Sequence, residues 1–158
     1  MMYLFIFLLI VILLFSILGS GKQQKKTGTI SGDFTSCGQL NTKTEQKFKL
    51  ALSEQLPAHL ELHCKVRLAD LCKPKDPRNF TSLNKVTSKH VDVVIVTAKT
   101  SEIVCAIELD DASHRTKRAK LQDSEKNYAL DAAGIPLYRI KPRANYDNVI
   151  HDILSKHP

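Results

Sequence analysis

Two short apolar runs, joined by a short connection, constrain the fold of this chain more than any other feature. Val91–Thr97 and Ile103–Leu109 are rich in β-branched side chains, and each has the length of a single strand. Residues 98–102 between them are a hairpin-length connection. The chain is therefore expected to build a sheet around this antiparallel pair, and the register of the pair decides which side chains meet.

Before this hairpin, the pattern predicts one helix and one strand. Thr42 or Thr44 can cap the helix, and Glu45 follows Thr42 at the spacing of a capping box. Residues 61–68 alternate between apolar and polar side chains, which indicates a half-exposed strand. The polar, proline-containing residues 73–90 are expected to form a long loop with room for one helical turn.

After the hairpin, the pattern predicts a helix, a strand and a second helix. Residues 115–133 contain no proline or glycine, and Gly134 is suited to cap that helix. Residues 137–140 are expected to form a short strand, and Asn145 or Asp147 can start the last amphipathic helix. The order α-β-β-β-α-β-α predicts a mixed α/β (α+β) fold, with helices packed against a central mixed sheet.

The N-terminal segment differs in composition from the rest of the chain. Residues 3–18 are almost wholly apolar, and with their neighbours they reach the ~20 residues that cross a bilayer. Three basic residues follow this segment directly: Lys22, Lys25 and Lys26. Positive charge beside a membrane span favours a cytoplasmic location for the part of the chain that follows it. A cleaved signal peptide is the alternative, although nothing basic precedes the segment.

We therefore expect a transmembrane anchor over residues 1–20, a flexible linker over 21–41 and one domain over 42–158. This places a single-pass protein in the inner membrane with its domain in the cytoplasm. The four cysteines show no C-x-x-C spacing, which fits a reduced compartment. The formal net charge of +7 is compatible with nucleic acid or anionic lipid headgroups as partners.

Acidic residues cluster at one end of the predicted hairpin. If the hairpin is symmetric about Thr100, Asp92 lies opposite Glu108, and Glu108 shares a face with Asp110. Like charges placed in this way are destabilising unless a cation lies between them, and carboxylates suit Mg²⁺ or Mn²⁺. We predict a metal site made of Asp92, Glu108 and Asp110. The alternative is that these acids are solvated at strand ends, and a register shift would move Asp92 to the other face.

Residues that follow the acids carry further candidate groups. His114 could act as a general acid–base or be an ordinary surface histidine. The next predicted helix carries three basic side chains: Lys117, Arg118 and Lys120. They could bind a nucleic-acid phosphate backbone or form an ordinary solvated face. Asp123 and Lys126 share a face of that helix.

Several of these segments together resemble the bacterial domain of unknown function 2726. They are Asp92, Glu108–His114, Gln122-Asp123 and Ala133–Ile140, and the resemblance extends over about residues 42–141. That family is similar to the restriction-endonuclease-like PD-(D/E)xK nucleases, in particular their Vsr-like branch.

The resemblance implies a core of αβββαβ order, with Asp92 and Glu108 at the two acidic metal positions of the nuclease motif. Glu45 would be the acid that many of these enzymes carry on the first helix. The motif's lysine, two residues after the acid, is replaced by Asp110 here. His114, Asp123 and Lys126 are candidates to compensate for it.

These observations predict a membrane-anchored nuclease-like domain that uses Mg²⁺ or Mn²⁺ to hydrolyse phosphodiester bonds, with DNA as the expected partner. The alternative is a non-catalytic module on the same fold that binds nucleic acid or protein, because a fold does not fix a function. A membrane-surface adaptor is a third possibility, and it would rest only on the anchor and the basic charge. Metal binding discriminates between the enzyme and the module.

Overall fold

The computed structural model describes residue 30 and residues 32–110, 117–141 and 144–158, with the side chains of 117–120 excepted. The predicted anchor, residues 1–20, lies outside this part of the chain, as do residues 21–29 and 31 of the predicted linker. Among the described residues, no helix is long and apolar enough to cross a membrane. The chain divides into two compact units, residues 1–36 and 37–158.

The second unit holds the helices and strands that the structure describes. In chain order they are α2 (Lys43–Gln55), β1 (Leu60–Arg67), α3 (Leu68–Leu71), α4 (Phe80–Thr87), β2 (His90–Thr97), β3 (Ile103–Leu109), α5 (Lys117–Ala132), β4 (Leu137–Ile140) and α6 (Tyr146–Ser155). The order predicted from the sequence is confirmed, with α3 and α4 added between the first two strands.

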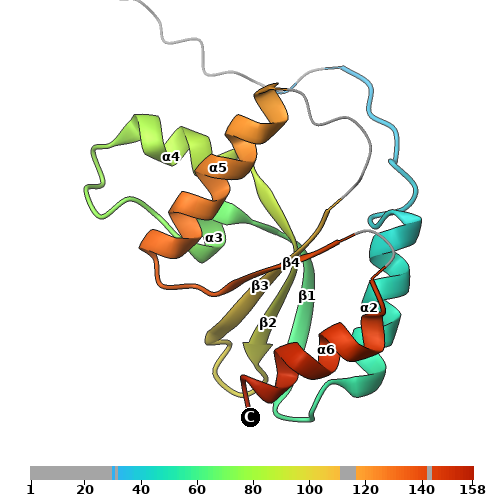
Figure 1. Cartoon of the computed structure of the whole chain (residues 1–158). Coiled ribbons are helices and arrows are strands. Elements are labelled where there is room, and N and C mark those ends of the chain that lie inside the picture. The colour runs from blue at the N-terminus through green and yellow to red at the C-terminus, as the bar shows by residue number, and fades with distance from the viewer. Residues whose placement is uncertain (1–29, 31, 111–116, 142–143) are drawn as a thin grey trace, which may run out of the picture. The chain divides into compact units, whose positions relative to one another are not determined.

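The four strands form one mixed sheet in the order β1-β2-β3-β4. β1, β2 and β3 are antiparallel neighbours, whereas β4 runs parallel to β3. Helices α2 and α6 lie together on one side of the sheet, and α3, α4 and α5 lie on the other (Figure 1). The prediction of a mixed α/β fold with helices against a central mixed sheet is therefore confirmed.

Each side of the sheet has its own hydrophobic core. The α2–α6 core consists of Phe48, Leu52, Leu60, Val93, Ile95, Cys105, Ile107, Ile140, Ile150 and Ile153. The α5 core consists of Leu68, Val86, Val91, Val94, Val96, Ala106 and Leu130. Because β2 and β3 contribute to both cores, they are buried on two faces, which explains their nearly continuous apolar sequences.

The start of α2 confirms the predicted capping box. The backbone N–H of Glu45 donates to Thr42 Oγ1 at 3.3 Å, and the Thr42 N–H donates to Glu45 Oε2 at 2.8 Å. These two contacts fix Glu45 in the first turn of α2, and its other carboxylate oxygen accepts a hydrogen bond from Lys65 of β1.

The segment 73–90 differs from the long loop that the sequence predicted. It contains α4, which is capped by the side chain of Asn79 and buries Val86 in the α5 core. The polar composition hid this helix, because its stability comes from packing against the rest of the fold rather than from helix propensity.

Candidate functional site

The predicted pairing of the two acidic strands is present in the register of β2 and β3. Val93 pairs with Ile107 and Ile95 pairs with Cys105, so the same register continued by one residue places Asp92 opposite Glu108. The register shifts after Ile95, so the assumed symmetry about the turn holds only at the end that bears the acids. Asp92 Oδ2 also accepts a hydrogen bond from the Leu109 N–H at 3.0 Å, which ties its carboxylate to β3.

A lysine from β1 lies between two of the predicted acids. Lys65 Nζ is 2.7 Å from Glu45 Oε1 and 3.2 Å from Asp92 Oδ1, and the three side chains are only 12–19% exposed. Burial alone would raise the pKa of Glu45, but the hydrogen bond and charge of Lys65, with the capping contacts to Thr42, hold it below its ordinary value. Burial opposes the charge of Lys65 likewise, yet Glu45 and Asp92 raise its pKa. These contacts therefore favour the charged forms of Glu45 and Lys65.

The backbone of Lys65 is as unusual as its contacts. Its φ of 55° is in the left-handed region, which costs a non-glycine residue of the order of 1–3 kcal/mol. Leu62 and Cys64, which precede it, pack against the α2–α6 core, whereas Val66 packs against the α5 core. The strand thus exchanges its two faces at Lys65, the position opposite Asp92, and this strain accompanies the ion cluster.

The second acid, Glu108, forms a separate buried ion pair. Lys126 Nζ of α5 lies 2.6 Å from Glu108 Oε1, and the two side chains are 13% and 10% exposed. Burial raises the pKa of Glu108; Lys126 opposes this rise, and the nearby charge of Asp92 adds to it. Lys126 thus favours the negative charge of Glu108, which burial and Asp92 oppose.

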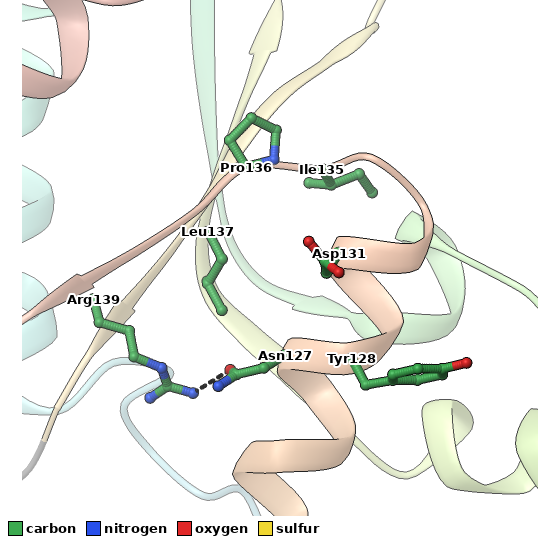
Figure 2. A pocket seen from close by; sticks show the side chains of 7 residues that line it. All are labelled: Asn127, Tyr128, Asp131, Ile135, Pro136, Leu137 and Arg139. Carbon is green, nitrogen blue, oxygen red and sulfur yellow. Dashed lines mark hydrogen bonds between the residues drawn. The ribbon is translucent and has the colours of Figure 1, made fainter.

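The third predicted acid has a different partner. Arg139 of β4 donates from Nη1 to Asp110 Oδ1 at 2.9 Å, and from Nη2 to Asn127 Oδ1 at 2.8 Å. Asp123 lies 3.9 Å from the same guanidinium. Figure 2 shows Arg139 reaching from β4 to Asn127 on α5. Asp92 and Glu108 therefore lie on paired strands, as predicted. Asp110 instead belongs to a group of polar side chains around Arg139.

Four predicted site residues lie wholly or partly outside the described part of the structure. His114 lies outside the described residues, and so do the side chains of Lys117, Arg118 and Lys120 on α5. Among the side chains that the structure describes, no three histidines, cysteines or acids are grouped as metal ligands. The proposed roles of these residues and of the metal stay predictions.

Two cations of the site were missed by the sequence analysis. Lys65 was assigned to the polar, half-exposed face of its strand, and Arg139 was given no role. In the structure, the pairing of Cys64 with Val93 and of Val66 with Val91 sets Lys65 opposite Asp92. The sequence alone does not show that pairing, since it depends on the register between strands far apart in the chain.

A comparison with known protein families identifies the family of this chain. The model of the family described as "Protein of unknown function (DUF2726)" matches residues 38–156. The chain belongs to this family. No curated protein and no solved structure matches the chain. The DUF2726 region contains the α2–α6 and α5 cores and all the acids discussed above, so the ion clusters lie within the family's own domain.

Proposed function

We propose that this DUF2726 domain is a metal-dependent nuclease that hydrolyses phosphodiester bonds in nucleic acid on a restriction-endonuclease-like αβββαβ core. The observation that carries the proposal is the placement of two carboxylates, Asp92 and Glu108, on neighbouring central strands at one end of the sheet. Glu108 is buried and its pKa is raised, partly by Asp92. Perturbed acids of this kind gather at catalytic sites, although ion pairs within a fold also perturb them.

The donor set fits a magnesium ion. Mg²⁺ is usually held by one or two carboxylates, with water and substrate phosphates completing the shell, so Asp92 and Glu108 would suffice. Glu45, Asp92 and Glu108 carry three negative charges against the two ammonium groups of Lys65 and Lys126. These five groups together have a net charge of −1, which favours a cation at Asp92 and Glu108.

The side chains around the acids suit the same reaction. Lys126 holds Glu108 at 2.6 Å and takes the place of the lysine that Asp110 replaces in the nuclease motif. Its ammonium, together with Lys65, would stabilise negative charge on a phosphate bound nearby. A Mg²⁺ or Mn²⁺ ion at such a site polarises the phosphate and lowers the pKa of an attacking water. We propose His114 as a general acid–base.

A backbone-binding surface would complete this site. We propose that Lys117, Arg118 and Lys120 bind the phosphate backbone, which would supply affinity without sequence choice. Their position near the start of α5, the helix that carries Lys126, supports this assignment.

One observation favours the alternative, a non-catalytic module on the same fold. Each of the three acids predicted to bind a metal already has a cationic partner within the protein: Lys65 for Asp92, Lys126 for Glu108 and Arg139 for Asp110. Buried ion pairs of this kind can be purely structural. A module would keep these pairs closed when Mn²⁺ is added, whereas a nuclease must open at least one of them.

The test measures cleavage and metal binding with the full chain in detergent. Labelled DNA and RNA, each single-stranded and double-stranded, are incubated with Mg²⁺ or Mn²⁺. We expect cleavage that Glu108→Gln abolishes and that Asp152→Asn, which removes an exposed pair with Lys156, leaves unchanged. Mn²⁺ should also raise the melting temperature of the wild type but not of Glu108→Gln. An equal rise in both proteins, with no cleavage by either, would favour the non-catalytic module.

We also propose that residues 1–20 anchor this domain in the inner membrane with the domain in the cytoplasm. The support is the apolar run of residues 3–18 and the lysines that follow it. Tagged protein should remain in the membrane fraction after an alkaline wash. Release into the soluble fraction, or a mature form that starts near residue 21, contradicts the anchor.

A further inference from the structure

An exposed aromatic ring on α5 lies at the edge of two hollows in the surface. Tyr128 is 76% exposed and lines both. The smaller hollow, of about 580 Å³, also includes Arg139, the residue that binds Asp110. Figure 2 shows the ring of Tyr128 pointing away from Arg139 and Leu137. Tyr128 therefore lies on α5 at the boundary between the smaller hollow, which contains Arg139, and the larger one.

The larger hollow is a groove between α4, α5 and the segment that precedes α4. We call it the α4–α5 groove; its volume is about 710 Å³, and its lining includes Lys73, Lys75, Lys85, Ser124, Tyr128 and Ala132. A tyrosine this exposed gains little from burial in the protein itself. A ring beside lysines is instead the arrangement that binds a stacked base together with its phosphate.

The charge of the α4–α5 groove favours an anion. Its two lining carboxylates, Asp76 and Glu125, are each paired with cations: Arg78 at 3.4 Å for Asp76, and both Lys85 at 2.7 Å and Lys89 at 2.9 Å for Glu125. Lys73 and Lys75 are exposed and add two further positive charges. The groove and its rim thus present more positive than negative charge around one aromatic ring.

We propose that the α4–α5 groove binds single-stranded nucleic acid, with one base stacked on Tyr128 and the backbone phosphates along Lys73 and Lys75. A single strand is favoured over a duplex because the stacking of neighbouring base pairs in a duplex hides the base faces that Tyr128 would contact. The inference rests on the proposed nuclease function and names its substrate class. A strand in the groove would pass Tyr128 toward Arg139 and Asp110, and so toward Glu108.

The test is binding of a labelled oligothymidylate of about 12 nucleotides to the full chain in detergent, followed by fluorescence anisotropy in EDTA. Tyr128→Ala should weaken binding by about 5- to 150-fold, the loss typical of one base–aromatic stack. Tyr128→Phe should bind as the wild type does. Leu121→Ala is the matched control, because Leu121 is 60% exposed on the same helix but does not line the groove.

Salt dependence and tyrosine fluorescence give two further measurements. Replacing both Lys73 and Lys75 with serine should reduce the slope of log affinity against log salt by roughly 0.7 for each lysine. The chain contains no tryptophan, so a strand stacked on Tyr128 should quench the tyrosine emission directly. Tyr128→Phe should bind equally well while losing that quenching. Because Phe retains a stacking ring, this variant also separates the stack from a folding defect.

Four results would overturn the proposal. The first is equal affinity of the wild type and Tyr128→Ala for the strand, and the second is an equal loss of affinity in Tyr128→Ala and Leu121→Ala. The third is undiminished quenching of tyrosine emission in Tyr128→Phe. The fourth is displacement of the strand by an acidic peptide at equal concentration, which would indicate a protein partner. EDTA keeps the result separate from catalysis. Strand binding that depends on Tyr128 without cleavage in Mg²⁺ or Mn²⁺ removes the nuclease and leaves the groove, whereas cleavage with unaltered binding by Tyr128→Ala removes only the groove.

Discussion

Replacing Lys126 with methionine perturbs the buried ion pair with little change in side-chain volume. The Glu108 and Lys126 side chains are 10% and 13% exposed, and their charged atoms are 2.6 Å apart. Removing one partner of a buried pair leaves an uncompensated charge and typically costs about 3–5 kcal/mol of unfolding free energy. An exposed pair contributes only about 0–1 kcal/mol, so Lys156→Met, which removes the exposed partner of Asp152, is the matched control.

The cost of Lys126→Met should depend on pH in a defined direction. Burial already raises the pKa of Glu108 above its ordinary value of 4.5, and loss of the Lys126 charge raises it further. The folded variant then holds a proton that the unfolded chain has released between pH 4.5 and the raised pKa. The difference between variant and wild type is therefore full above the pKa of Glu108 in the folded variant and decreases as pH falls through it. It disappears below the pKa that Glu108 has in the folded wild type, which is itself above 4.5.

The measurement is urea unfolding of wild type and variant at a series of pH values, with the difference in free energy taken at each pH. Taking the difference cancels the acid destabilisation that other carboxylates, such as Glu45, impose on both proteins. The double variant Glu108→Gln/Lys126→Met should recover most of the loss, because it removes both charges of this pair. A cost below about 1 kcal/mol that does not vary with pH would refute the buried pair and the raised pKa together.

Three further predictions concern other parts of the domain. Thr42→Ala should cost about 1 kcal/mol in urea unfolding because it removes the cap of α2, whereas Thr44→Ala within the helix should not destabilise. Burial raises the pKa of the Cys105 thiol to about 12, so an alkylating reagent at pH 8 should label exposed Cys37 at once and Cys105 only on unfolding, as mass spectrometry of peptides will show. His114→Ala should lower the cleavage rate by about 10²–10⁴-fold. Its affinity for Mn²⁺, measured by calorimetry, should stay within a few-fold of the wild type, whereas cleavage at the wild-type rate would show that His114 is an ordinary surface residue.

The sequence alone predicted the features that depend on local pattern. The capping box at Thr42, the strand over residues 137–140 and the hairpin that sets Asp92 opposite Glu108 were all readable, because each depends on residues close together in the chain. Lys126 was selected as a candidate from its place on α5, and the structure sets it against Glu108. Local pattern does not show whether the acids bind a metal, and metal binding stays a prediction.

The tertiary structure decided which cation meets which acid. Lys65 reaches both Glu45 and Asp92 because β1 pairs with β2 and exchanges its faces at a left-handed residue. Arg139 reaches Asp110 because β4 lies parallel to β3 across a long connection. Hydrophobic periodicity assigns a side chain to a face, but it does not give the register between distant strands or a break in their alternation. The sequence thus determined the fold and the acids, whereas packing between distant elements determined the ion pairs around them.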